Sequence, residues 1–248
     1  MFDQTLHAYL RALMQPHAHV VGSFLVSIDE HDAGLFRNYA VPDDGAVPSA
    51  LEVDRLVSFF REHGRTPRLE YLPGLSPAVE PALLAAGFVP ERRLPVMTCP
   101  PSETASSPNP AGIELTLALT DDQLRLVAQA QNEAYGQAET TDPDVARLHG
   151  TLDRGGLVGL AVDSSTGHSV GGGLCAPPHA GVSELAAVGV RAAYRRRGIA
   201  TALTALLTRS CPDYGINTPF LTPAGKEEER IYRSAGYQQV TEMLHISQ

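Results

Sequence analysis

The sequence Val-Gly-Val-Arg-Ala-Ala-Tyr-Arg-Arg-Arg-Gly-Ile-Ala-Thr-Ala-Leu-Thr-Ala-Leu-Leu occupies residues 188–207. An apolar run typical of a strand ends at Val190, and Ile199 opens a stretch rich in Ala and Leu that is typical of a helix. A short turn follows Val190, and three consecutive arginines, Arg195 to Arg197, then lead into Gly198. The first N–H groups of a helix have no intrahelical partner, and the helix dipole favours negative charge there. The stretch therefore predicts a turn that binds phosphate.

Two better-known phosphate motifs are absent from the chain. A Walker loop requires Gly-x-x-x-x-Gly-Lys-Ser/Thr, and no such stretch occurs. Gly171-Gly172-Gly173 resembles part of a dinucleotide fingerprint but lies in an apolar run with no helix after it. These glycines instead predict a strand with close backbone packing or a bulge.

The spacing Arg195-x-x-Gly198-x-Ala200 resembles motif A of the GNAT acetyltransferase superfamily, which is Arg/Gln-x-x-Gly-x-Gly/Ala after a strand. The resemblance implies that this turn binds the pyrophosphate of acetyl-CoA, and that the strand before it pairs with the pantetheine arm. The implied cofactor-binding residues are Val188, Gly189, Val190, Arg195, Arg196, Arg197, Gly198, Ile199, Ala200 and Thr201. The alternative is a basic turn that is only solvated.

A second motif lies downstream, in a helix expected from Lys226 to Ala235 and closed by Gly236. Ile231-Tyr232-Arg233-Ser234-Ala235-Gly236-Tyr237 resembles GNAT motif B, Leu-Tyr-x-x-x-Gly-Phe. The resemblance implies that Tyr232 lies near the thioester sulfur and protonates the leaving thiolate, and a phenol suits that role. The family often has an asparagine seven residues before this tyrosine, where the chain has Gly225. The alternative for Tyr232 is plain core packing.

Glu184 is the candidate general base. It lies near the start of an otherwise uncharged run that ends at Val190, eleven residues before Arg195. A lone carboxylate at the mouth of a buried strand is a place where the pKa can rise toward neutrality. The alternatives are a strand-edge charge facing water, a carboxylate that only binds a cationic substrate, and deprotonation of the amine through a chain of waters.

Composition excludes several classes of protein. The 248 residues carry a net charge of −9, which argues against a general nucleic-acid binder. Three cysteines without paired spacing argue against a disulfide framework and against a zinc site, so no metal is expected. No apolar run is long enough to span a membrane, and the first residues lack the pattern of a signal peptide. We expect a cytoplasmic protein without membrane contact.

The chain divides at a linker rich in Pro, Ser and Ala, residues 100–112. Residues 113–248 have the order of elements of a GNAT domain, and residues 1–99 resemble a degenerate copy, with Ala86-Gly87-Phe88 echoing Ala235-Gly236-Tyr237. Residues 41–48 contain two aspartates and no arginine, so we expect no coenzyme A there. The resemblance implies an α/β (α+β) GNAT fold, a mixed, mostly antiparallel sheet flanked by helices, in two tandem domains.

Three functions compete on this evidence. The first is an N-acetyltransferase that moves an acetyl group from acetyl-CoA to a primary amine by direct attack. The second is an acyl-CoA-binding sensor or regulatory module without turnover, and the third is a structural protein whose basic turn is incidental. The acceptor, a small molecule or a peptide amine, cannot be identified from the sequence. An acidic cluster near Tyr135 could attract a cation or could be only a solvated loop, and its acidic members are Glu133, Glu139, Asp142 and Asp144. We expect a monomer or a weak homodimer.

Overall fold

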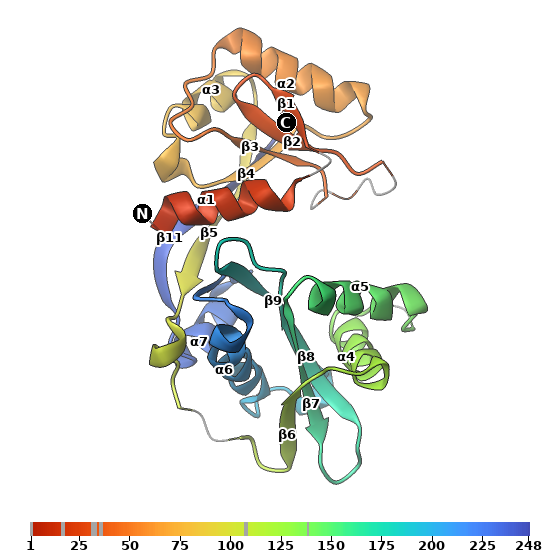
Figure 1. Cartoon of the computed structure of the whole chain (residues 1–248). Coiled ribbons are helices and arrows are strands. Elements are labelled where there is room, and N and C mark those ends of the chain that lie inside the picture. The colour runs from red at the N-terminus through yellow and green to blue at the C-terminus, as the bar shows by residue number, and fades with distance from the viewer. Residues whose placement is uncertain (1, 16–17, 31–33, 35–36, 107–108, 138) are drawn as a thin grey trace. The chain divides into compact units, whose positions relative to one another are not determined.

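The computed structural model describes residues 2–15, 18–30, 34, 37–106, 109–137 and 139–248. It divides into two compact units (Figure 1). The first consists of Met1–Val96 together with Gln239–Gln248, and the second of Met97–Gln238. No helix in the described ranges has the length and apolar character needed to cross a membrane.

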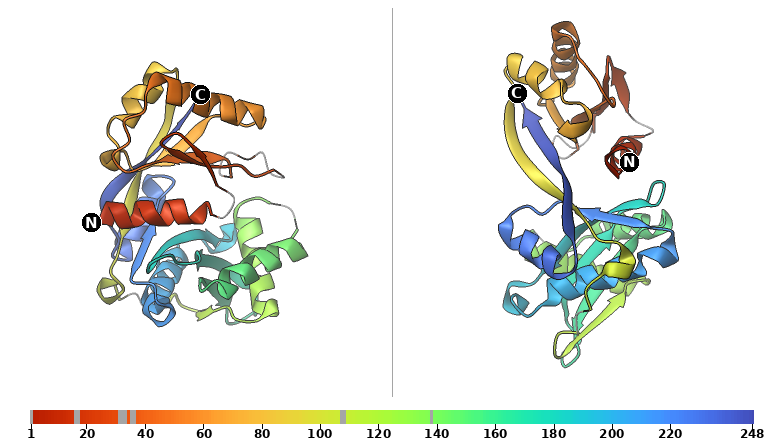
Figure 2. Two further views of the ribbon diagram at one scale, coloured as in Figure 1. Left: turned by 45° about the horizontal axis from the view of Figure 1, so that its top comes forward. Right: turned by 90° about the vertical axis from the view of Figure 1, so that its left-hand side faces the viewer.

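The first unit is a sheet with the strand order β1-β2-β3-β4-β11-β5. Its core lies where α2 and α3 pack on one face of the sheet, and Figure 2 shows β11 running beside β5. The elements are α1 (Phe2–Leu13), β1 (His19–Val21), β2 (Phe24–Ser27), β3 (Tyr39–Pro42), α2 (Ala50–Glu62), β4 (Arg68–Tyr71), α3 (Val79–Ala85), β5 (Val89–Thr98) and β11 (Gln238–Ser247).

The second unit has the strand order β5-β10-β9-β8-β7-β6, to which β5 contributes its last two residues. Strands β6 to β9 are antiparallel, and β10 pairs with β9 in parallel. The elements are β6 (Ile113–Leu117), α4 (Asp121–Ala134), α5 (Asp142–Asp153), β7 (Leu157–Asp163), β8 (Ser169–Cys175), β9 (Val182–Val190), α6 (Ile199–Ser210), β10 (Thr218–Leu221) and α7 (Lys226–Ser234).

The three glycines of β8 let helices approach both faces of this sheet. A Cβ on Gly172 would lie 2.8 Å from Val127 Cγ1 of α4, and one on Gly173 would lie 3.3 Å from Leu207 Cδ1 of α6. Figure 1 shows α4 and α6 on opposite sides of β8. The expected strand with close backbone packing is therefore what this run forms.

The division differs from the expected one at the end of the chain. Residues 113–248 were expected together, but the last ten residues belong to the first unit. Leu244 and Ile246 of β11 lie in the core of that unit, and Leu244 is paired with Tyr71 of β4. The expected linker, 100–112, falls within the second unit, where Ala105 donates a backbone hydrogen bond to the carbonyl of Ala235.

Candidate functional site

The strands β9 and β10 pair only over the first residues of β9. The last paired residues are Glu184 and Phe220, and β10 ends one residue later. From Leu185 to Val190, β9 is bonded to β8 on one side and to none of the described strands on the other. Its outer edge is therefore available to an extended ligand that can pair with the backbone.

The helix that follows β9 begins without a side-chain cap. Its N-cap residue is Gly198, in the left-handed conformation at φ 80°, and no side chain accepts from the first turn. A Cβ on Gly198 would meet open space. The N–H groups of Ile199, Ala200 and Thr201 are thus left for an anion from outside the helix.

The arginines before this helix serve different purposes. Arg195 donates from Nε to the carbonyl of Val190 at 3.1 Å and from Nη2 to the carbonyl of Ala134 at 3.2 Å. Arg197 donates to the carbonyl of Ala111. Arg196 has a side chain that is 88% exposed, and it lies 3.8 Å from Glu227 of α7. Arg196 is therefore the arginine most accessible to a phosphate, whereas Arg195 ties the turn to β9 and α4.

The last turn of α4 is bonded to β9 at a break in the strand. Ala187 has a φ of 54°, where the β8–β9 register shifts, and Gln131 Nε2 donates to its carbonyl at 2.8 Å. A non-glycine residue at positive φ is strained, and such strain gathers at functional sites. Gln131 and Arg195 together position the end of α4 beside the free edge of β9.

A cavity of about 970 Å³ lies between the free edge of β9, the start of α6 and the start of α7. Nine of the ten predicted cofactor residues line it, and Arg197 does not. The lining residues are Ala134, Tyr135, Val188, Gly189, Val190, Tyr194, Arg195, Arg196, Gly198, Ile199, Ala200, Thr201, Glu227, Glu228, Arg230 and Ile231. The cavity thus has uncapped N–H groups at one part of its wall and a bare strand edge at another.

Tyr232 lies on α7, half-buried against the core of the second unit. Its ring centroid is 6.3 Å from that of Tyr237. Burial raises the pKa of Tyr232, and the neighbouring groups of Tyr135, Glu228 and Glu184 raise it further. The phenol therefore stays protonated at any ordinary pH and can act as a proton donor.

Glu184 is half-buried at the point where β9 and β10 separate. Its charge is the smallest of the influences that raise the pKa of Tyr232, after burial, Tyr135 and Glu228. Neither residue is among those that line the cavity of about 970 Å³. The roles of Tyr232 and Glu184 as acid and base stay predictions.

The three cysteines, Cys99, Cys175 and Cys211, are free and buried. Cys175 Sγ is 3.8 Å from Cys211 Sγ, and this contact together with burial raises the pKa of Cys175. Burial also raises the pKa of Cys99. A nucleophilic cysteine needs the opposite shift. In the part of the chain that the structure describes, no group of three His, Cys, Asp or Glu residues is arranged to hold a metal ion.

The sequence analysis did not predict that α7 lines the cavity of about 970 Å³. Glu227, Glu228, Arg230 and Ile231 line the cavity, although the motif carried by this helix pointed only to Tyr232. Of the acidic cluster near Tyr135, Glu133 is paired with Arg191 at 3.3 Å and Asp144 caps α5. Only Tyr135 from that cluster reaches the cavity.

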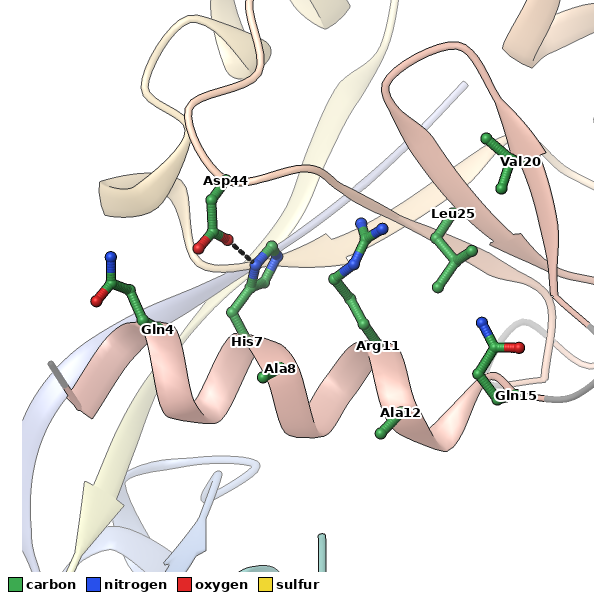
Figure 3. A pocket seen from close by; sticks show the side chains of 9 residues that line it. All are labelled: Gln4, His7, Ala8, Arg11, Ala12, Gln15, Val20, Leu25 and Asp44. Carbon is green, nitrogen blue, oxygen red and sulfur yellow. Dashed lines mark hydrogen bonds and ion pairs between the residues drawn. The ribbon is translucent and has the colours of Figure 1, made fainter. Parts of the chain in front are cut away.

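A second cavity, of about 550 Å³, lies in the first unit between α1, Leu25 and Asp44. Figure 3 shows His7 pointing from α1 toward Asp44, with which it forms a hydrogen bond. Arg11 donates to the carbonyl of Pro42 at 3.0 Å and is paired with Asp43 at 2.8 Å. The polar groups of α1 therefore hold the 41–48 turn in place.

The family comparison matches residues 119–237 to the Acetyltransferase (GNAT) family. This range includes α4 to α7, both predicted catalytic residues and all ten predicted cofactor residues. A search of curated proteins found no match.

Several solved structures named as GCN5-related or tandem GNAT proteins share the fold of the chain. A GCN5-related N-acetyltransferase from Kribbella flavida is 22% identical, with a TM-score of 0.80 over 99% of this chain and 95% of that chain. One from Sphaerobacter thermophilus is 23% identical, with a TM-score of 0.62 over 80% and 65%. A tandem GNAT protein from the clavulanic acid biosynthesis pathway is 13% identical, with a TM-score of 0.64 over 93% and 79%. The expected GNAT fold, a mixed and mostly antiparallel sheet flanked by helices, is confirmed.

Proposed function

We propose that the domain formed by residues 119–237, which belongs to the GNAT family, is an N-acetyltransferase that transfers an acetyl group from acetyl-CoA to a primary amine. The observation that carries the proposal is the uncapped start of α6, lying in one cavity with the free edge of β9. In this proposal, residues 1–96 form a degenerate GNAT-like unit that binds no coenzyme A. We also propose a cytoplasmic location.

Each part of acetyl-CoA has a group in the cavity with which it could interact. The pyrophosphate would accept hydrogen bonds from the N–H groups of Ile199, Ala200 and Thr201, with Arg196 adding charge. The pantetheine amides would pair with the backbone of Val188–Val190 as an added strand. The acyl end would then lie toward the part of β9 nearest Tyr232 and Glu184.

The reaction in this proposal is direct transfer without an acyl-enzyme. The amine loses a proton to Glu184, either directly or through water, and its nitrogen forms a bond to the acetyl carbonyl carbon. The carbon–sulfur bond breaks, and the thiolate takes the hydroxyl proton of Tyr232. The nitrogen, now bonded to the acetyl group, gives its extra proton to the phenolate, which restores Tyr232. The burial of Cys99, Cys175 and Cys211 supports this route over a cysteine nucleophile.

Gly225 supports keeping a second candidate, a sensor that binds acyl-CoA without turnover. It is the N-cap residue of α7, and it supplies no side chain where the family pattern often has an asparagine. A ligand can be held by α6 and β9 without that group, whereas turnover needs the acyl end to be aligned as well.

The first test is thermal melting with and without millimolar acetyl-CoA. A ligand that binds only the native state stabilises it by about 2.7 kcal/mol at a hundredfold excess over Kd. We expect a clear rise in Tm, followed by thiol release with at least one amine of a broad panel. A rise without thiol release for any amine would favour the sensor, and no rise would reject acyl-CoA binding.

A further inference from the structure

Tyr135 lines the cavity in which the proposed thioester would bind, beside the segment of β9 proposed to pair with pantetheine. It is the C-cap residue of α4 and lines the cavity between β9 and α7. A Cβ on Gly189 would be 3.4 Å from Tyr135 Cε2, so the ring lies over the backbone of β9 beside its free edge. The residue is 54% exposed, so its ring borders open space rather than the core.

The end of α4 is held rigidly enough to make this ring a wall. Gln131 is bonded to Ala187, and Arg195 to Ala134, so side-chain bonds join the last turn of α4 to β9 and to the turn after it. The backbone of Gly189 also packs closely against α4, because a Cβ on Gly189 would lie 3.1 Å from Ala134 Cβ. These contacts fix the backbone from which the ring of Tyr135 extends.

The same cavity is lined by the helix that carries the candidate general acid. Tyr135 of α4 and Glu228 and Ile231 of α7 all line it, and Ile231 directly precedes Tyr232. After burial, the phenol of Tyr135 is the neighbour with the largest effect on the pKa of Tyr232. The ring of Tyr135 therefore faces the α7 wall of the cavity.

We propose that Tyr135 sets the acyl-chain preference of the site, by closing the space beyond a two-carbon acyl group. This inference rests on the proposed function, because it assumes that acyl-CoA binds along β9. A pocket that excludes extra methylene groups by shape discriminates about 10- to 200-fold per group. The ring of Tyr135 supplies the shape, and its hydroxyl is not needed for it.

The test is calorimetric binding of acetyl-CoA and of butyryl-CoA, which requires no knowledge of the acceptor. Wild type is expected to bind acetyl-CoA more tightly than butyryl-CoA by tenfold or more. Tyr135→Ala is expected to reduce this ratio at least tenfold, mainly by improving the affinity for butyryl-CoA. Tyr135→Phe keeps the ring and is expected to retain the wild-type ratio.

Tyr214→Ala is the matched control, because Tyr214 is a partly exposed tyrosine of the same unit outside the cavity. If Tyr135→Ala binds acetyl-CoA but keeps the wild-type ratio, the proposal for Tyr135 is overturned while the proposed function stands. If Tyr135→Phe changes the ratio as much as Tyr135→Ala does, the hydroxyl rather than the ring is responsible, and the proposal is again overturned. Failure of wild type to bind either thioester would overturn both.

Discussion

Each unit has a helix that follows a strand and a turn, and the two helices begin in opposite ways. In the first unit, Ser49 caps α2, and Glu52 completes a capping box with it. In the second, Gly198 precedes α6 and no side chain caps the helix. The turn before α2 carries Asp43 and Asp44, whereas the turn before α6 ends in three consecutive arginines, Arg195 to Arg197, and Gly198. A helix start binds an anion only if its own side chains leave the N–H groups open.

The largest expected effect separates these two turns directly. Gly198→Glu should reduce acetyl-CoA affinity about 100-fold or more, because charge-assisted hydrogen bonds of about 1.5–3 kcal/mol each are lost. Gly45→Glu is a close control, since Gly45 has a φ of 70° and open space around it, like Gly198. It should leave the affinity unchanged. Equal losses in calorimetry for both variants would contradict the assignment of the site to the second unit.

The second prediction compares one tyrosine from each unit. Tyr232→Phe should lower kcat about 100-fold with little change in acetyl-CoA affinity, as expected for loss of a general acid. Tyr71→Phe removes a buried hydroxyl without a hydrogen-bond partner from the first unit, and kcat should not change. Thiol release with an amine identified in the panel measures both. A wild-type rate for Tyr232→Phe would reduce this residue to a packing role.

The third prediction concerns pH and the first unit. Burial lowers the pKa of His7 and of His245 below the ordinary value of 6.5, even though Asp44 and Glu70 act in the opposite direction. Below pH 6.5 the unfolded chain therefore binds more protons than the native unit, and stability falls as the solution is acidified.

Hydrogen exchange measured at pH 7.5 and at pH 5.5 tests this difference. Protection factors in residues 1–96 should drop more than those in 97–238, and His7→Gln should lessen the drop. An equal drop in both units, or no effect of the His7 variant, would mean that the buried histidines do not govern the acid response.

The smallest expected effect comes from the cap of α2. Ser49→Ala should lower the free energy of unfolding by about 1 kcal/mol, the usual contribution of such a cap. Acetyl-CoA affinity should stay at the wild-type value. Denaturant unfolding measures the free energy of unfolding, and calorimetry on the same preparation measures the affinity. Weaker acetyl-CoA binding by Ser49→Ala would contradict the prediction, because it would show that the cap of α2 in the first unit affects ligand binding.

Much of the second unit could be predicted because its signals are local. The Arg195–Gly198 turn, the start of α6 at Ile199 and the end of α7 before Gly236 follow from residues close together in the sequence. The first unit was harder to predict. Helix α1 has no strong local start signal, and its buried His7 and half-buried Arg11 are explained only by Asp44 and Asp43, more than thirty residues away.

The sequence by itself determined the two motifs that resemble the GNAT family, the basic turn and the acidic character of its counterpart, because motif spacing and charge depend on neighbouring residues. Tertiary structure decided the rest. The transfer of β11 to the first unit depends on Leu244 packing in a distant core. The free edge of β9 depends on where β10 stops. The position of Tyr135 over Gly189 depends on hydrogen bonds that join α4 to β9 and the turn after it. Contacts between residues far apart in the chain leave no local pattern from which these features could be predicted.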